Sequence, residues 1–168
     1  MVFDMDMHDP RADISKLEKM LRFFNDPTDR GKLYINYPAM ESYRHLTSLN
    51  DHDFKDRRVS ISQFPDYKAI VEKEGHKGLK DLRRCDKATF RPMIDMHLKK
   101  SNRILSGTYA LPSSEKFLSW EGADILKKQQ KSMDEDGSLF VLNTSLFNVV
   151  DYRPGDFLRN DDQVNDKI

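Results

Sequence analysis

Two acidic residues near the start of the chain have a spacing suited to metal binding. Asp4 and Asp6 follow the apolar pair Val2-Phe3, and side chains at positions i and i+2 of a strand point to the same side. If Val2-Phe3 is the end of a buried strand, both carboxylates lie at its carboxyl end, where α/β folds place their ligands. Mg²⁺ prefers such oxygen ligands. The motif therefore predicts a Mg²⁺ (or Mn²⁺) site, although an acidic turn before a helix also serves as capping chemistry.

A third carboxylate, Glu41, is expected near the same edge of the sheet. Residues 32–37 predict a strand, and Pro38 ends it and can open a helix with Glu41 in its first turn. Glu41 would be a further metal ligand, or it would only complement the helix dipole. His8 and His45 are close to these acids in the sequence, but a single histidine is more often a hydrogen-bonded structural residue than a ligand.

The elements that must position these residues alternate between strand and helix. Asp13 can cap an amphipathic helix over residues 14–24, which precedes the strand at 32–37. The helix after Pro38 is expected to turn its apolar residues inward: Met40, Tyr43 and Leu46. This order of strand, helix, strand and helix predicts a parallel sheet.

A mostly helical part is expected to follow. We predict a short edge strand at 59–62 and helices at five places: 67–73, 78–84, 87–105, 113–133 and 139–152. The last of these is the most apolar stretch and is predicted as a core helix, with a strand over 139–142 as the alternative. The sequence thus predicts an α/β protein in three parts: a partial parallel sheet in residues 1–58, a helical segment packed on it in 59–157, and a frayed polar tail in 158–168.

Composition limits the class of protein. Lys plus Arg (28) balance Asp plus Glu (28), so the net charge does not favour nucleic acid, although local patches could still bind it. Cys85 is the single cysteine, which excludes an intramolecular disulfide and fits a reducing compartment. No apolar run approaches the roughly 20 residues that span a bilayer, and residues 1–9 lack the pattern of a signal peptide. We therefore expect a cytoplasmic protein without membrane contact.

One basic cluster could contact nucleic acid. On a helix, four basic residues would form a stripe facing the phosphates of DNA or RNA: Lys80, Arg83, Arg84 and Lys87. The alternative is a solvated face, which is common in a charge-rich protein.

The N-terminal segments together resemble the Toprim domain of the OLD and RloB-like nucleases of bacterial phage defence and abortive infection. In that family a strand ends in an Asp-x-Asp that binds Mg²⁺, as in residues 2–6, and a Pro-x-x-Glu opens a later helix, as in residues 38–41. The resemblance covers residues 2–50. It implies metal-assisted cleavage of phosphodiester bonds, with Asp4 and Asp6 holding Mg²⁺ and Glu41 as a further ligand or catalytic group. Lys68 is the candidate for the family's late catalytic lysine.

The chain departs from the family at its start. Toprim domains have an earlier strand that ends in a catalytic Glu, and there is no room for it before Val2. We expect a preceding segment of a longer protein, or another chain, to supply it, and a partner ATPase is a further expectation. A sheet that lacks this strand would expose an edge, which favours homo-oligomerisation.

Two other interpretations remain open. Haloacid-dehalogenase-like phosphatases also begin with Asp-x-Asp after an apolar strand, the first Asp acting as nucleophile and the second as acid and base. Residues 3–6 resemble that opening, but His8 replaces the usual Thr or Val, and the late acidic pair would have to be Asp161-Asp162. The second alternative is a non-catalytic helical interaction module or remnant subunit.

Overall fold

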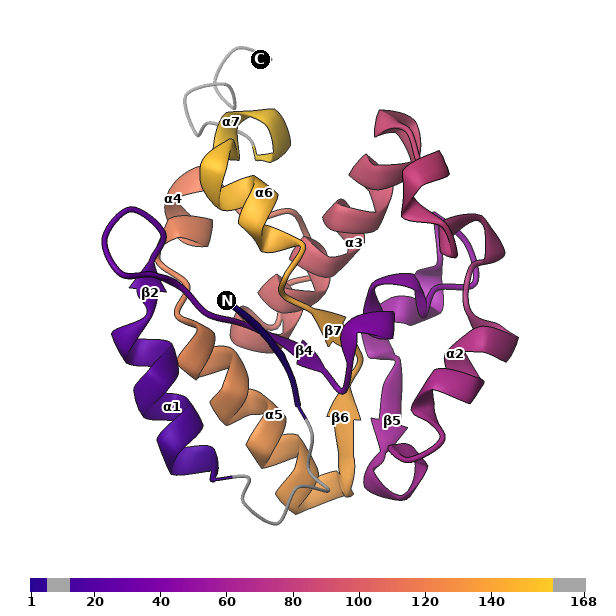
Figure 1. Ribbon diagram of the computed structural model, residues 1–168, viewed down its shortest axis with the longest axis horizontal. Coiled ribbons are helices and arrows are strands. Elements are labelled where there is room, and N and C mark those ends of the chain that lie inside the picture. Colours follow the sequence, from indigo (N-terminus) through magenta and orange to yellow (C-terminus); the bar gives the residue numbers. More distant parts are fainter. Residues whose placement is uncertain (6–12, 159–168) are drawn as a thin grey trace.

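The computed structural model describes residues 1–5 and 13–158 of the chain. Helices surround a small central sheet (Figure 1), so the protein is of the mixed α/β kind. Two further antiparallel strand pairs lie outside this sheet: β2 (Asn25–Asp26) with β3 (Gly31–Lys32), and β5 (Arg58–Ser60) with β6 (Ser138–Phe140). The edge strand predicted near residues 59–62 is therefore confirmed as β5.

The central sheet joins strands from both ends of the chain. Its order is β1 (Val2–Asp4), β4 (Tyr34–Tyr37) and β7 (Leu142–Asn143). β1 runs parallel to β4, with Asp4 opposite Asn36, whereas β7 runs antiparallel to β4. The predicted parallel pairing of the first two strands is confirmed. The sheet as a whole is mixed, because a strand that we predicted as helix completes it.

β1 is an edge strand and is not buried. Val2 and Phe3 are each 42% exposed, and within the described residues no strand pairs with the outer edge of β1. The expectation of a buried strand before Asp4 was wrong, because only β4 has neighbours on both sides and is buried along its whole length. Met5, directly after β1, does enter the core.

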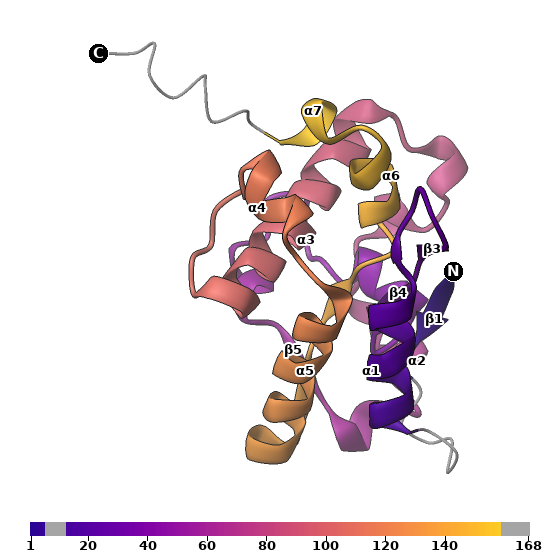
Figure 2. The same cartoon turned by 90° about the vertical axis from the view of Figure 1, so that its left-hand side faces the viewer.

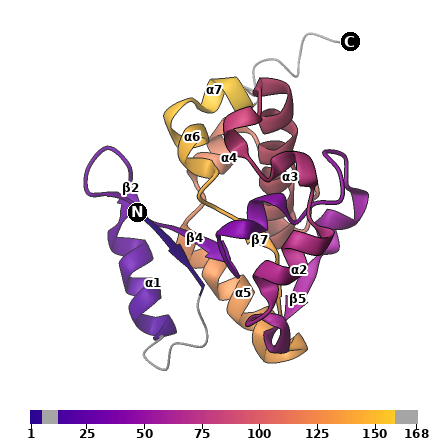
Figure 3. The same ribbon diagram turned by 45° about the vertical axis from the view of Figure 1, so that its right-hand side comes forward.

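Seven α-helices lie in the described part of the chain. They are α1 (Ile14–Phe23), α2 (Tyr67–Glu74), α3 (Lys87–Ser106), α4 (Ser114–Leu118), α5 (Gly122–Asp136), α6 (Phe147–Tyr152) and α7 (Pro154–Phe157). Asp13 caps α1 as predicted, since its carboxylate accepts a hydrogen bond from the backbone N–H of Lys16 at 3.1 Å. α1 and α5 lie side by side (Figures 1 and 2). α1 and α2 lie on opposite sides of β4 (Figures 1 and 3). None of the helices in the described residues is long and apolar enough to cross a membrane.

The predicted core helix over residues 139–152 is wrong. The segment forms β6 and β7, and a helix begins only at Phe147. Its polar residues explain the difference, because the Thr144 hydroxyl accepts from the Ile35 N–H at 2.9 Å and donates to the Ile35 carbonyl at 2.7 Å. The Asn143 side chain accepts from the Leu146 N–H at 3.3 Å. These bonds tie the segment to β4 and turn it before a helix can start, so the alternative of a strand over 139–142 is closer.

The predicted helix over residues 113–133 is divided in two. α4 ends at Leu118, and α5 begins at Gly122 after an extended Glu121 (φ −102°, ψ 137°). Trp120 in this turn packs against the Phe117 ring at 5.5 Å between centroids. Gly122 fits because α5 packs closely on α1, where a Cβ at this position would lie 2.8 Å from Leu21 Cδ2.

Two shorter helices also differ from the prediction. After Pro38 the chain forms a 3-10 helix, Met40–Arg44, and Leu46 is buried as expected, but Met40 is 42% exposed instead of pointing inward. The helix expected over residues 78–84 is replaced by two 3-10 turns, Lys77–Leu79 and Leu82–Arg84. The Asp81 carboxylate causes this break, because it accepts from the Arg83 N–H and caps a new turn.

One apolar core extends through the described residues. It includes Ile35 of β4, Phe54, Leu98 of α3, Leu126 of α5 and Leu139 of β6. The predicted boundary at residue 58 runs through this core and through the β5–β6 pair. Leu158, which the sequence assigned to the polar tail, is 5% exposed and packs on the core, while residues 159–168 lie outside the described residues.

Candidate functional site at the carboxyl end of the parallel strands

A hollow opens where the parallel strands β1 and β4 end. Its volume is about 320 Å³. Its lining comes from the end of β1, the turn after β4 and the start of α2: Asp4, Met5, Pro38, Ala39, Phe64, Pro65, Tyr67 and Lys68. We call it the Asp4 hollow. The carboxyl ends of parallel strands are where α/β proteins place ligands, so a metal site of the predicted kind would lie here.

Lys68 connects Glu41 to this hollow. Its Nζ lies 3.6 Å from Glu41 Oε1, and the Lys68 side chain is 74% exposed whereas that of Glu41 is 24% exposed. Glu41 lies in the first turn of the 3-10 helix Met40–Arg44. Lys68 thus contacts Glu41 and lines the same hollow as Asp4, whereas Glu41 is not among the residues that line the hollow.

Glu41 has one carboxylate oxygen without a partner. Oε2 is buried, and no described residue donates a hydrogen bond to it. A buried polar atom in this state is costly, and most buried polar atoms in folded proteins are hydrogen-bonded. A cation or a hydrogen-bond donor bound beside Glu41 would remove this cost.

Asn36 holds Asp4 in place and was missed by the sequence analysis. The Asn36 amide donates to Asp4 Oδ1 at 3.2 Å, and its own oxygen accepts from the Ser145 N–H at 3.3 Å. Asn36 is fully buried and lies opposite Asp4 in the β1–β4 register. A polar residue in the middle of an otherwise apolar and aromatic strand was the signal that could have found it.

The donor set fits Mg²⁺ only as a partly hydrated ion. Asp6 and His8 lie outside the described residues. Among the residues that are described, no group of three or more His, Cys, Asp or Glu side chains is arranged to hold a metal ion. Mg²⁺ commonly binds one or two carboxylates and keeps several waters, and Asp4, which lines the hollow, offers one such carboxylate. Glu41 and Asp6 stay predicted as the additional ligands.

His45 lies behind the hollow and does not line it. Its Nδ1 is 3.2 Å from the Tyr67 hydroxyl, and its Nε2 is 3.7 Å from a Glu74 carboxylate oxygen. Burial, followed by the positive charge of Arg57, lowers the pKa of His45 to about 4. His45 is therefore neutral at pH 7 and supports Tyr67, which forms part of the wall of the hollow.

The basic residues predicted to bind nucleic acid do not form one helical stripe. Lys80 pairs with Glu72, while Arg83 Nε and Arg84 Nε lie 2.9 and 3.4 Å from the Asp81 carboxylate. Lys87 is the first residue of α3. The prediction of one continuous stripe was wrong, because the helix expected over residues 78–84 is interrupted at Asp81. Lys80, Arg83 and Arg84 still line a common surface hollow with Lys77, and their role in binding phosphates stays a prediction.

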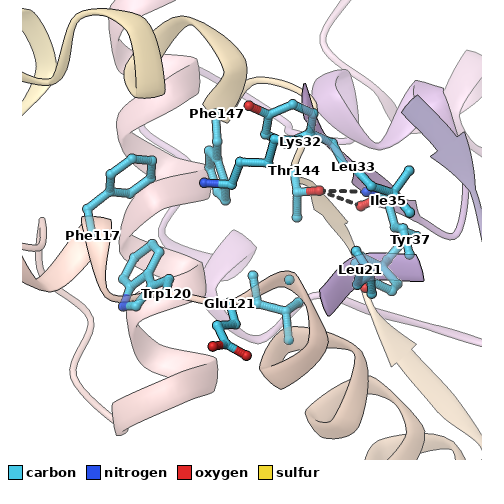
Figure 4. A pocket seen from close by; sticks show the side chains of 13 residues that line it. Leu21, Lys32, Leu33, Ile35, Tyr37, Phe117, Trp120, Glu121, Thr144 and Phe147 are labelled. Carbon is cyan, nitrogen blue, oxygen red and sulfur yellow. Dashed lines mark hydrogen bonds between the residues drawn. The ribbon is translucent and has the colours of Figure 1, made fainter. Parts of the chain in front are cut away.

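An apolar pocket lies elsewhere, between α1, β4, α5 and α6 (Figure 4). Its volume is about 30 Å³, and its wall includes Leu21, Phe117, Trp120 and Phe147. The hydroxyl of Thr144 makes two backbone hydrogen bonds and offers none to a ligand. Lys32 and Glu121 also line this pocket, but none of the described residues predicted for the metal site does, so the pocket has no part in the predicted chemistry.

Comparison of the chain with protein-family models, with curated proteins and with solved structures gave no match. The Asp4 hollow therefore has to be interpreted from its own residues.

Proposed function

We propose that this protein is a Mg²⁺-dependent nuclease of the Toprim type, which hydrolyses phosphodiester bonds of DNA or RNA in the Asp4 hollow. The contact between Lys68 and Glu41, at 3.6 Å beside a hollow that Asp4 also lines, carries the proposal. A cation and two acids at the carboxyl end of parallel strands are the groups that phosphoryl chemistry needs. The resemblance of residues 2–50 to the phage-defence nucleases supports the same conclusion.

Each residue has a role that follows from its chemistry. Bound Mg²⁺ would activate a water and stabilise the negative charge of the transition state. Asp4 and Asp6 would hold the metal, with Asn36 fixing the orientation of Asp4 through its 3.2 Å hydrogen bond. Glu41 would bind the metal, or orient a metal ligand, through Oε2. The Lys68 ammonium is exposed and would pair with a phosphate oxygen of the substrate.

The proposal includes a contribution from outside the described residues. The resemblance requires one more strand ending in a catalytic Glu, and the outer edge of β1 has no partner among the described strands. That strand would pair there, whether it comes from a longer protein, a second copy or another chain. A partner ATPase, as in the family, would regulate cleavage during phage defence.

A cleavage assay tests the proposal. We expect the protein, together with any native partner with which it co-purifies, to cut plasmid DNA or RNA with Mg²⁺ or Mn²⁺. Asp4→Asn and Lys68→Ala should each lower the rate about 100-fold, the scale of losing one group that stabilises the transition state. Asp29→Asn, which removes an exposed carboxylate away from the hollow, should not change it. Cleavage that is equal in Asp4→Asn and wild type would contradict the proposal. Turnover of a phosphomonoester that depends on Asp4 would favour the phosphatase.

A further inference from the structure

Trp120, the single tryptophan of the chain, separates two cavities. On its inner side it packs near the rings of Phe117 and Phe147, with centroids at 5.5 and 6.4 Å, and faces the apolar pocket. On its outer side it lines a surface hollow of about 410 Å³ between α3, α4 and α5. We call this the Trp120 hollow, lined also by Ser106, Lys116, Asp124, Lys127 and Lys128. In Figure 4 the Trp120 nitrogen points away from the apolar pocket.

Two of the three lysines that line the Trp120 hollow have no charge partner among the described residues. Among the described residues, Lys116 Nζ donates only to the Ser106 hydroxyl, at 3.1 Å, and Lys128 forms no ion pair. Lys127 is paired with Glu18 at 3.4 Å. No described residue accepts a hydrogen bond from the Trp120 N–H. Asp124 is the opposing charge, so the lining keeps an excess of positive charge next to an aromatic ring.

We propose that the Trp120 hollow binds single-stranded nucleic acid, with a base stacked on Trp120 and the adjacent phosphates on Lys116 and Lys128. Proteins that bind single strands combine an aromatic platform with cations that follow the backbone. The hollow is open and bordered by surface lysines, which suits a strand that crosses it better than an enclosed metabolite. The site does not include the Asp4 hollow and needs no metal, so it is independent of the proposed nuclease activity.

Intrinsic fluorescence can report on this site alone, because Trp120 is the only tryptophan. We would titrate the full chain with a short oligodeoxythymidylate in EDTA, so that no cleavage occurs. Saturable quenching is expected at low salt, weakening as salt rises. The double variant Lys116→Ala/Lys128→Ala should bind at least tenfold more weakly, and its salt dependence should fall by about 1.4 in log–log slope, because each lost phosphate contact of a single strand contributes about 0.7.

Two further variants make the test specific. Lys131→Ala removes an exposed α5 lysine that pairs with Glu135 and lies outside the hollow, and it should bind like wild type. Asp124→Asn should bind roughly two- to fivefold more tightly, since it removes the opposing charge. An absence of quenching, equal quenching in the double variant, or binding seen by anisotropy of a labelled oligonucleotide without a Trp120 response would each overturn the proposal. The Asp4→Asn variant should bind normally, so a failure of the nuclease would leave this result unchanged.

Discussion

Lowering the pH should destabilise this protein, because His97 is held neutral in its core. His97 of α3 is fully buried, and its ring lies 4.8 Å from that of Phe54. Its Nδ1 accepts from the Asn143 N–H at 3.1 Å, and its Nε2 lies 3.4 Å from the Tyr43 carbonyl oxygen. His97 thus joins α3 to β7 and to the 3-10 helix that carries Glu41. Burial, followed by the charge of Lys100, lowers the pKa of His97 to about 3.

The size of the effect follows from this pKa. Unfolded, the imidazole titrates at 6.5, and in the fold at about 3. Between pH 3 and 6.5 the unfolded chain binds a proton at this imidazole that the folded chain does not bind. The free energy of unfolding therefore decreases as the pH falls through this range. The loss is about 1.4 kcal/mol per pH unit, or about 2 kcal/mol at pH 5. His45, whose pKa is lowered to about 4, changes stability in the same direction.

Urea unfolding at pH 7, 6 and 5 measures this loss. His97→Gln keeps an oxygen that can accept from the Asn143 N–H but does not titrate. It should be less stable than wild type at pH 7, because it loses the contact with Phe54, and it should lose about 2 kcal/mol less between pH 7 and 5. His52→Gln, which removes an exposed imidazole, should follow the wild-type curve. If His97→Gln lost as much free energy of unfolding as wild type between pH 7 and 5, the conclusion that His97 is buried in its neutral form would be refuted.

Three further predictions concern stability and can be measured by urea unfolding. Asp13→Ala should cost about 1 kcal/mol by removing the N-cap of α1, and Asp13→Asn should recover most of it. Gly107 ends α3 with φ +81°, and a Cβ at this position would meet no atom within 4 Å. Gly107→Ala should therefore cost about 1 kcal/mol through backbone strain alone. An unchanged stability would contradict this backbone effect. Lys100 is fully buried, and its burial, followed by the charge of Arg57, lowers its pKa. The free energy of unfolding of wild type should therefore rise relative to that of Lys100→Met as pH rises from 7 toward 10.5. The same dependence on pH in both proteins would contradict a lowered pKa of Lys100.

The sequence predicted the parts of the fold that depend on neighbouring residues. The apolar period after Asp13 located α1, and the β-forming run before Pro38 located β4. Parallel pairing then followed from the order of the elements, because a helix between two strands favours it. Asp4, at the end of β1, and Glu41, in the turn after β4, were proposed as site residues from the same order of elements, and Lys68 was added by the resemblance alone. Their roles stay predictions.

The parts that the sequence did not predict depend on contacts between distant segments. β7 pairs with β4 because Thr144 bonds to Ile35, and nothing local to Thr144 indicates this. Asn36 stands out as a polar residue within an apolar and aromatic strand, but its contact with Asp4 follows only from the register of β1 and β4. The turn at Trp120 is fixed by ring packing and by the close approach of Gly122 to Leu21. At Thr144 and Trp120, tertiary contacts override a local preference for helix.

The most direct test of the Asp4 hollow is a titration with Mg²⁺ and Mn²⁺ that follows thermal stability. A metal that binds only the folded chain raises its stability by about 2.7 kcal/mol at a concentration 100 times its dissociation constant. We predict such a rise in wild type, a smaller rise in Glu41→Gln, and none in the double variant Asp4→Asn/Asp6→Asn. The Asp29→Asn control should respond like wild type. An equal response in wild type and the double variant, or none in either, would contradict a metal site at Asp4 and Asp6.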